Sequence, residues 1–389
     1  MIVLAGKNNI AVNALNFICN KLEKQEVLVV CNKNDNRRHG WQRSLGKTAE
    51  ERCVKVISLE EAYNFPVDVF ISLEFDRIIR PERFSTKNIY NIHFSELPKY
   101  KGMYTSVWPI LNNEDTSGVT LHKIDSGIDT GGIISQVKFE INDGDRSRDL
   151  YRNYLKYSFQ LFADSFESIM AGCMPCRDQE SKGGSYYSSD SIDFNSIKIN
   201  LNKTAWEIRK QVYAFSFREY QLPMLFGRSV VEVLVLGDRS KFRPGTVVFE
   251  DPEYVDVATI DYNVRIFFDG IHKLSSFASC KINEVDGLIN GLCGVNDRNN
   301  NGWSPIIVAS YNGNIDVVER LLSLGADVND VNYNGTSVLM YAKDFCIKAQ
   351  DSMLFKYLIE RGADVNHRDF NGKTVIDYMS ASQIDFLGI

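Results

Sequence analysis

Residues 88–102 read NIYNIHFSELPKYKG, a short apolar strand that ends in a turn containing proline and glycine. Asn91 and His93 are two positions apart, a spacing that places both side chains on one face of a strand. Open α/β sheets bind their ligands at the carboxyl ends of strands, which is where this pair lies. Polar residues also occur at strand ends without any catalytic role, so the pair alone indicates only a candidate site.

A second stretch, residues 118–133, reads GVTLHKIDSGIDTGGI. It places His122 on a strand and both Asp125 and Asp129 in a glycine-containing loop. Such a loop can wrap a flat ligand with its backbone and direct an Asp at the His of the first stretch. An Asn, a His and an Asp that converge on one point supply an oxyanion donor, an acid/base group and a carboxylate that orients it.

The first 140 residues alternate strand and helix signals, which predicts a parallel sheet with helices on its faces. Helical spacing covers residues 10–21 and, over a longer span, residues 146–171, where Gly172 is a natural end. A polar stretch over residues 178–190 is typical of a linker or surface loop. We therefore expect an α/β domain over residues 1–185. Its predicted strands are the apolar runs at 2–4, 27–30, 54–57 and 67–71.

The rest of the chain predicts two further domains. Over residues 190–278, one helix at 204–214 precedes strands at 230–236, 245–249, 254–259 and 262–268, so we expect a small β-rich domain. Over residues 280–389, a segment ending in Gly-Ala-Asp-Val-Asn occurs at 321–329 and again at 357–366, with a degraded copy at 288–296. The 33-residue spacing from Asn296 of the degraded copy to Asn329 predicts an α-helical ankyrin repeat array, with the extra residues of the next repeat near 345–351.

Composition excludes several classes of protein. The chain has 389 residues, of which 44% are hydrophobic and 24% charged, so it is not largely disordered. The net charge of −6 disfavours a nucleic-acid partner. The absence of a long apolar run and of a signal peptide predicts a cytoplasmic protein without a membrane partner. Only Cys173 and Cys176, of eight cysteines, form a C-x-x-C pair, and without a second pair we expect no metal.

The two motif stretches resemble the folate-dependent formyltransferases, whose pattern is N-x-H-x-S-x-L-P, then K-Y-x-G, G-V-T-x-H and D-x-G-x-D-T-G. The resemblance covers about residues 1–170 and implies a Rossmann-like domain with 10-formyltetrahydrofolate as the formyl donor. It implies that Asn91, His93 and Asp129 are the catalytic residues. Asn91 and protonated His93 would stabilise the negative charge on the formyl oxygen, while Asp129 orients His93 and helps to remove the proton of the attacking amine.

The resemblance also implies where the donor binds, with plain core packing as the alternative for the two isoleucines at 78 and 79. The sequence departs from the family pattern at Phe94, Glu96 and Gly132, none of them a catalytic position. His122 would support Asp129 or Asn91. The implied donor-binding residues are Arg77, Ile78, Ile79, His122, Asp125 and Ile128.

The aromatic-rich turn at 101–109 and the segment at 215–221 are similar to the sugar N-formyltransferases within this family. They imply dTDP-3-amino-3,6-dideoxy-D-glucose as the acceptor, in O-antigen and lipopolysaccharide sugar synthesis. A dTDP-4-amino sugar, methionyl-tRNA, hydrolysis of formyltetrahydrofolate, and an inactive formyltransferase-like ankyrin adaptor stay open as alternatives. Tyr220 would stack on thymine, and Arg218 or Lys101 would meet the pyrophosphate. The implied substrate-binding residues are Ser95, Lys101, Met103, Tyr104, Arg218 and Tyr220.

The ankyrin array has three candidate roles: structural support, a protein-binding surface, and a second site for a nucleotide sugar. Trp303 stands where ankyrin repeats usually place a small or polar exposed turn residue. Beside Tyr311 and Tyr333, an exposed indole could stack on a nucleotide base. We also expect the protein to be a homodimer.

Overall fold

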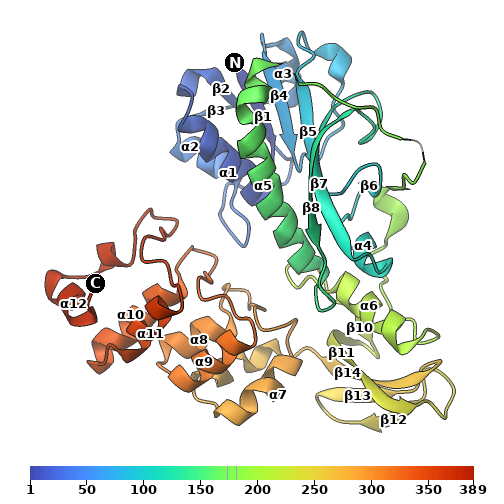
Figure 1. Ribbon diagram of the computed structural model, residues 1–389, viewed down its shortest axis with the longest axis vertical. Coiled ribbons are helices and arrows are strands. Elements are labelled where there is room, and N and C mark those ends of the chain that lie inside the picture. The colour runs from blue at the N-terminus through green and yellow to red at the C-terminus, as the bar shows by residue number, and fades with distance from the viewer. Residues whose placement is uncertain (173, 181) are drawn as a thin grey trace. The chain divides into compact units, whose positions relative to one another are not determined.

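The computed structural model describes residues 1–172, 174–180 and 182–389, and the chain forms two compact units, Met1–Ser196 and Ile197–Ile389 (Figure 1). Cys173, one half of the C-x-x-C pair, lies outside the described residues. The separation of a β-rich domain from an ankyrin domain, with a boundary near residue 280, stays a prediction, because both segments lie in the second unit.

A seven-stranded sheet with the order β3-β2-β1-β4-β5-β7-β8 forms the centre of the first unit. The five strands from β3 to β5 are parallel, as the sequence predicts, but β7 runs antiparallel to both of its neighbours, β5 and β8. The prediction of a parallel sheet is therefore wrong for β7. A hairpin loop joins β7 to β8, so β8 again runs in the direction of β5. The strands are β1 (Ile2–Gly6), β2 (Val27–Cys31), β3 (Lys55–Val56), β4 (Val69–Leu73), β5 (Ile89–His93), β7 (Thr116–Lys123) and β8 (Ile133–Glu140).

Helices cover both faces of this sheet, which explains why its central strands are apolar without alternation. On one face, α1 (Asn8–Cys19) packs against α5 (Ser147–Ala171), and α5 also runs along β7 and β8 (Figure 1). Val3 of β1 joins a buried cluster with residues of α3 (Leu59–Asn64). Helix α2 (Leu45–Glu51) packs against α1 and against strands β2 and β3.

The long helix α5 has the bounds that its periodicity predicts, because both of its ends carry local signals. Asp149 in its first turn accepts a hydrogen bond from the backbone N–H of Arg146, which completes a capping box. Gly172 ends the helix in a left-handed conformation with φ of 69°. Between the ends, Phe162 and Phe166 pack edge-to-face on Phe17 of α1, with ring centroids 5.9 and 5.4 Å away.

The polar stretch at 178–190 is more than a linker. Tyr186 and Tyr187 form a short strand, β9, that pairs in parallel with β6 (Lys101–Gly102). The ring of Tyr187 stacks on Trp108 of α4 (Trp108–Leu111) at a centroid distance of 3.9 Å. This pairing joins segments about 85 residues apart, so no local pattern could have indicated it.

The second unit begins with α6 (Ala205–Phe215), whose cap residue Thr204 accepts a hydrogen bond from the N–H of Glu207. The helix packs on a five-stranded antiparallel sheet with the order β10-β11-β14-β13-β12, which agrees with the predicted β-rich segment. The strands are β10 (Met224–Leu225), β11 (Arg228–Arg239), β12 (Val247–Glu250), β13 (Tyr254–Val257) and β14 (Tyr262–Phe268).

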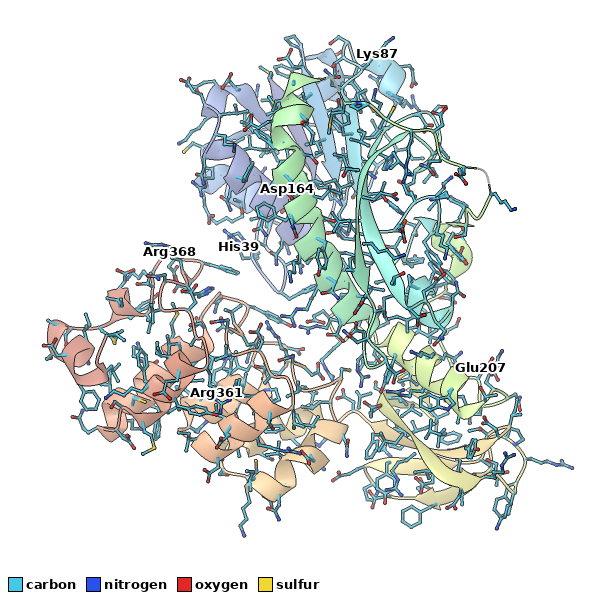
Figure 2. The ribbon with its side chains drawn as sticks, in the orientation of Figure 1. His39, Lys87, Asp164, Glu207, Arg361 and Arg368 are labelled. Atoms are coloured by element: carbon cyan, nitrogen blue, oxygen red, sulfur yellow. The ribbon has the colours of Figure 1, made fainter. Side chains whose placement is uncertain are left out.

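The C-terminal helices stack around one continuous hydrophobic cluster, as ankyrin repeats do. Asn296 and Asn329 join successive repeats, since their side chains accept from the backbone N–H groups of Asp327 and Asp364 at 3.0 and 2.8 Å. Side chains such as Arg361 project outward (Figure 2). Across the described residues, no helix has both the length and the apolarity for a membrane crossing. The helices are α7 (Val285–Asn290), α8 (Pro305–Tyr311), α9 (Ile315–Ser323), α10 (Val338–Ala349), α11 (Met353–Glu360) and α12 (Ala381–Leu387).

Candidate active site

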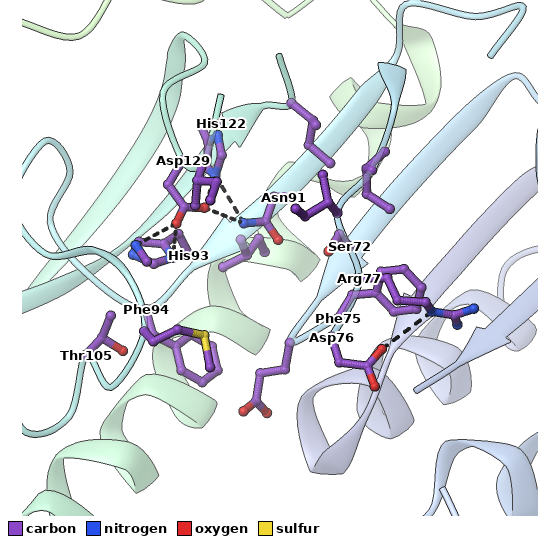
Figure 3. A pocket seen from close by; sticks show the side chains of 18 of the residues that line it. Ser72, Phe75, Asp76, Arg77, Asn91, His93, Phe94, Thr105, His122 and Asp129 are labelled. Atoms are coloured by element: carbon purple, nitrogen blue, oxygen red, sulfur yellow. Dashed lines mark hydrogen bonds and ion pairs between the residues drawn. The ribbon is translucent and has the colours of Figure 1, made fainter. Parts of the chain in front are cut away.

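A cavity of about 450 Å³ opens at the carboxyl ends of β1, β4 and β5 (Figure 3). Its walls also include the loop between β7 and β8 and the turn after β6. The location is that expected for a ligand site of an open α/β sheet. All three residues that the sequence predicts as catalytic, Asn91, His93 and Asp129, line this cavity.

Strand pairing fixes the first two functional side chains. Asn91 of β5 lies directly opposite His122 of β7 in the antiparallel ladder, and the Asn91 Nδ2 atom is 3.1 Å from His122 Nε2. The second ring nitrogen of His122, Nδ1, is 2.7 Å from the carbonyl oxygen of Lys123. Because a carbonyl oxygen can only accept, Nδ1 carries the proton and Nε2 is free to accept from Asn91. His122 therefore holds the orientation of the Asn91 amide.

Asp129 reaches the same point from the loop between β7 and β8. Its backbone is left-handed, with φ of 54°, and the Gln179 side chain donates to its carbonyl oxygen at 2.8 Å. One carboxylate oxygen, Oδ2, accepts from the backbone N–H of Gly102 at 2.9 Å and lies 3.4 Å from His93 Nδ1. The other, Oδ1, lies 3.6 Å from His122 Nε2. Two imidazoles and one backbone donor thus surround a single carboxylate.

This environment keeps Asp129 ionised. Burial by itself would raise the pKa of the carboxyl group, but the charge of the nearby His93 and the hydrogen bond from the Gly102 N–H outweigh it and lower the pKa well below its ordinary value. Opposite charges and hydrogen-bond donors both favour the charged form of a carboxylate. The site therefore offers an anionic carboxylate against the ring of His93.

His93 is buried, and acceptors flank both of its nitrogens. Its Nε2 atom is 2.8 Å from the carbonyl oxygen of Tyr100, and its Nδ1 faces Asp129. A ring between two acceptors is suited to the imidazolium form, in which both nitrogens donate. Tyr100 has a left-handed backbone, with φ of 58°, in the turn that carries this carbonyl. The arrangement provides a proton donor that a carboxylate orients.

The Asn91 amide nitrogen has two neighbours in this structure. It donates to His122 at 3.1 Å and to Asp129 Oδ1 at 3.4 Å (Figure 3). The second contact is long for an N–H···O hydrogen bond. Donation by Asn91 to an oxygen atom in the cavity therefore requires release of the weaker contact, to Asp129.

All six residues predicted to bind the donor line the cavity. The Ile78 side chain is 76% exposed and that of Ile128 is 44% exposed, so core packing is wrong as the explanation for Ile78. Ile79 is only 9% exposed and belongs to a hydrophobic cluster, so core packing holds there. The Arg77 guanidinium donates to the carbonyl oxygen of Cys31 at 2.7 Å, which fixes the segment that follows β4. Exposed isoleucines in a cavity are suited to a flat, partly apolar ligand.

The predicted substrate-binding residues separate into two groups. Met103 and Tyr104 line the cavity, but Ser95 and Lys101 do not. Ser95 is fully buried, and its hydroxyl donates to the Lys99 carbonyl at 2.7 Å, so it stabilises the turn after β5 and does not face a ligand. Lys101 is half-buried on β6.

Three further predicted residues belong to the second unit. The Arg218 guanidinium is held by Asp269 and Asp297, with contacts of 2.6 to 2.9 Å, and is therefore engaged within its own unit. The Tyr220 side chain is 57% exposed. Trp303 contacts the ring of Tyr311 at 5.8 Å, as predicted, and that of Tyr341 at 5.6 Å, but it is half-buried, so the expectation of an exposed indole is wrong.

Several lining residues were missed by sequence reasoning. Lys7 follows the last residue of β1, and the rule that ligands bind at strand carboxyl ends could have indicated it. Tyr186 depends on the pairing of β9 with β6, which leaves no local signal. Within residues 1–172, 174–180 and 182–389, no group of three or more His, Cys, Asp or Glu side chains is placed to hold a metal ion. Other missed residues are Ser72, Thr105 and Ile124.

Comparisons with known proteins bear on this site. A family model described as formyl transferase matches residues 2–165, and a model for three copies of ankyrin repeats matches residues 276–369. A methionyl-tRNA formyltransferase from Fervidobacterium nodosum is 26% identical over 304 residues, which are 72% of this chain and 94% of that protein.

Two solved structures are more similar in sequence. The N-formyltransferase from Helicobacter canadensis, crystallised with folinic acid and dTDP-3-aminofucose, is 43% identical with a TM-score of 0.64; the match covers 69% of this chain and 98% of that chain. WlaRD, a sugar 3N-formyl transferase crystallised in the presence of dTDP and 5-N-formyl-tetrahydrofolate, is also 43% identical with a TM-score of 0.64. This match covers 69% of the present chain and 97% of WlaRD.

Proposed function

The chain belongs to the sugar N-formyltransferase family, and from this we propose that it transfers a formyl group from 10-formyltetrahydrofolate to the amino group of dTDP-3-amino-3,6-dideoxy-D-glucose. One observation carries the proposal: Asn91, His93 and Asp129 come together in one cavity. The relatives that are 43% identical were crystallised with a folate and with dTDP or a dTDP-3-amino sugar, which supports both the donor and the acceptor.

The residues of the cavity fit a folate donor. Ile78 and Ile128 present apolar surface that a ligand would cover, and Asp125 lies in the same loop as Ile128. The Asp125 carboxylate accepts from the backbone N–H of Gly127 at 3.0 Å and from the Thr130 hydroxyl at 2.7 Å, which keeps the loop in one shape. These residues and the segment 77–79 would hold the pterin ring. When bound, the donor supplies the formyl carbon that the amine attacks.

The three catalytic residues then divide the work. His93, as an imidazolium, donates from Nε2 to the oxygen on which negative charge develops once that N–H leaves the Tyr100 carbonyl, because Nδ1 faces Asp129. Asn91 donates to the same oxygen once its long contact with Asp129 opens. The Asp129 carboxylate holds the His93 ring and accepts the proton that the attacking nitrogen loses. Preorganised donors of this kind stabilise charge most strongly in a site that excludes water.

A transfer assay tests this proposal. The full-length protein is incubated with 10-formyltetrahydrofolate and, separately, with dTDP-3-amino-3,6-dideoxy-D-glucose, its 4-amino counterpart and methionyl-tRNA. We expect the mass of the 3-amino sugar to increase by one formyl group, and we expect His93→Asn to abolish this change. Formylation of the 4-amino sugar or of methionyl-tRNA in its place would reassign the acceptor. Release of formate without any formylated acceptor would contradict the proposal.

The remaining predictions concern the setting of this activity. A homodimer, a cytoplasmic location, a role in O-antigen and lipopolysaccharide synthesis, and binding of a protein or a second nucleotide sugar by the ankyrin array all stay predictions. The half-buried Trp303, packed between Tyr311 and Tyr341, favours structural support as the role of that aromatic cluster. The net charge of −6 favours a nucleotide sugar over methionyl-tRNA as the acceptor.

A further inference from the structure

The cavity contains a carboxylate and an ammonium group that the proposed transfer does not use. Glu74 and Lys7 both line it. The Lys7 ammonium makes no hydrogen bond or ion pair to any residue that the structure describes, yet its charge acts on the Glu74 carboxyl group. The two groups are therefore near each other without direct contact. A carboxylate and an ammonium group at this separation can bind the same ligand hydroxyl, which donates to the carboxylate and accepts from the ammonium group.

Glu74 is held firmly in place. The Tyr151 hydroxyl lies 2.9 and 3.0 Å from its two carboxylate oxygens, and the Asn8 side chain donates to one of them at 3.3 Å. The Asn32 side chain donates to its backbone carbonyl at 3.0 Å. Both Glu74 and Asn8 have left-handed backbones, with φ of 55° and 62°. Non-glycine residues persist in this region where the surroundings fix them, and such positions cluster at functional sites.

Burial supports a role for Glu74 in ligand binding. It raises the pKa of the carboxyl group to about 7, although Lys7, Tyr151 and Asn8 each act to lower it. A carboxyl group buried at this cost, and aimed at a cavity, is more often found at functional sites than elsewhere. A ligand hydroxyl that donates to the carboxylate would offset the cost.

Sheet register places this pair beside the reacting residues. Gly6 of β1 pairs with Leu73 of β4, and Leu73 pairs with Ile92 of β5. Lys7, Glu74 and His93 are the next residues of these three strands, so they form one row across the carboxyl edge of the sheet. Neighbouring strands are about 4.8 Å apart. A substituent on the ring carbon next to the reacting amine is thus within reach of Glu74 when the amine lies at His93.

We propose that Glu74 and Lys7 together bind a ring hydroxyl next to the amino group that receives the formyl group, with Glu74 as its acceptor and Lys7 as its donor. This inference rests on the proposed function and deepens it, because it makes the pair the specificity-determining residues for hydroxylated amino sugars. An acceptor without that hydroxyl would leave two charged groups in the cavity without a partner, which is the strongest form of discrimination between similar ligands.

The test compares protein variants and substrate analogues in one cycle. We measure kcat/KM for the dTDP-3-amino sugar and for its 2-deoxy and 4-deoxy analogues, with the wild-type enzyme, Glu74→Gln, Lys7→Met and the double variant. We expect one of the two analogues to be roughly 10- to 100-fold poorer with the wild-type enzyme, as loss of a charged hydrogen bond predicts. In the double variant, kcat/KM for the same analogue should be within about threefold of the value for the parent sugar, because neither charged partner of the hydroxyl is present. Equal losses in the wild type and the double variant would overturn the inference.

Two controls keep this test interpretable. Asp76→Asn removes another carboxylate of the cavity wall, one that pairs with Arg77, and it should keep the wild-type ratio between the sugars. Dissociation constants of the same sugars, measured with tetrahydrofolate present, report hydroxyl binding without turnover. If no sugar is formylated but the binding ratios follow the expected pattern, the proposed function fails and the inference stands. If formylation occurs and the ratios do not change between variants, the inference alone fails.

Discussion

At the scale of single residues, His93 and His122 share one carboxylate but differ in their second neighbour. His93 lies between Asp129 and the carbonyl of Tyr100, so it can act as a proton donor. His122 donates to the Lys123 carbonyl and accepts from Asn91, so it positions another side chain. His93 therefore has a chemical role and His122 a structural one, and their different hydrogen-bond partners account for the difference.

This difference predicts unequal losses of activity. His93→Asn should lower kcat by roughly 10³-fold, the usual contribution of a positioned acid/base group. His122→Asn should lower it about 10-fold, because Asn91 loses its orientation while the reacting groups remain. Steady-state kinetics over a pH series check this: His122→Asn should keep the pH profile of the wild type, and His93→Asn should not. Equal losses for both variants would contradict the assignment.

Glu74 gives a prediction about stability and pH. Burial raises its pKa in the folded protein to about 7, from an ordinary value of 4.5. Between these values the folded state holds a proton that the unfolded state releases, so stability falls as the pH rises through this range. Glu74→Gln has no charge to bury, so its free energy of unfolding, relative to that of the wild type, should be larger by ~2 kcal/mol at pH 8 than at pH 5.

Chemical denaturation at the two pH values measures this difference. The matched control is Glu60→Gln, an exposed carboxyl group that pairs with Arg83 and whose pKa is lowered by that hydrogen bond. Because its pKa is lowered and not raised, its effect should change little between the two pH values. An equally constant effect for Glu74→Gln would show that its carboxyl group is not buried at a cost.

At the scale of elements, the short strand β6 connects backbone geometry to the catalytic carboxylate. Gly102 has φ of 87°, and a Cβ atom there would lie 2.1 Å from the carbonyl oxygen of Tyr187. Its N–H donates to Asp129 at 2.9 Å. Gly102→Ala should therefore separate β6 from β9, move the partner of Asp129 and lower kcat about 10- to 100-fold, the usual effect of a small misplacement in an active site.

Hydrogen exchange of the Met103 amide, which donates to the Tyr187 carbonyl at 2.8 Å, reports whether the strands separate. Gly144→Ala is the matched control, because a Cβ atom at that position meets nothing within 4 Å. It should leave both kcat and exchange at Met103 unchanged. Normal activity in Gly102→Ala would show that β6 does not position Asp129.

Elements that local interactions determine could be predicted from the sequence, and those that depend on distant segments could not. Helix α5 has a capping residue, a regular apolar face and a terminal glycine within its own 25 residues, so its bounds follow from local rules. Asn91 and His93 could be placed on one strand face for the same reason. The pairing of β6 with β9 and the antiparallel pairing of β7 with β5 depend on contacts between distant segments. Tyr186, which lines the cavity only through that pairing, could not be predicted.

At the scale of the whole molecule, the second unit contains a buried charge cluster that joins its two kinds of structure. Arg218 follows α6 of the β-rich segment, Asp269 follows β14, and Asp297 lies among the first ankyrin turns. The Arg218 guanidinium contacts both carboxylates, and the Asp297 side chain is 1% exposed. Two backbone N–H groups, of Cys293 and Arg298, also donate to Asp297. This cluster explains why the β-rich and ankyrin segments form one compact unit.

Removal of the arginine should therefore be far more damaging than removal of a surface cation. Arg218→Met leaves a buried carboxylate without its charged partner, and we expect the free energy of unfolding to fall by about 3 to 5 kcal/mol. Arg320→Met is the matched control: its bidentate pair with Asp286 is exposed to solvent and should contribute little to stability. Hydrogen exchange should then increase across both the β-rich and the ankyrin segments of Arg218→Met. Adding Asp297→Asn should recover part of the loss, because the unpaired charge is removed with its partner. Equal costs for the two arginine variants would mean that the cluster does not join the segments.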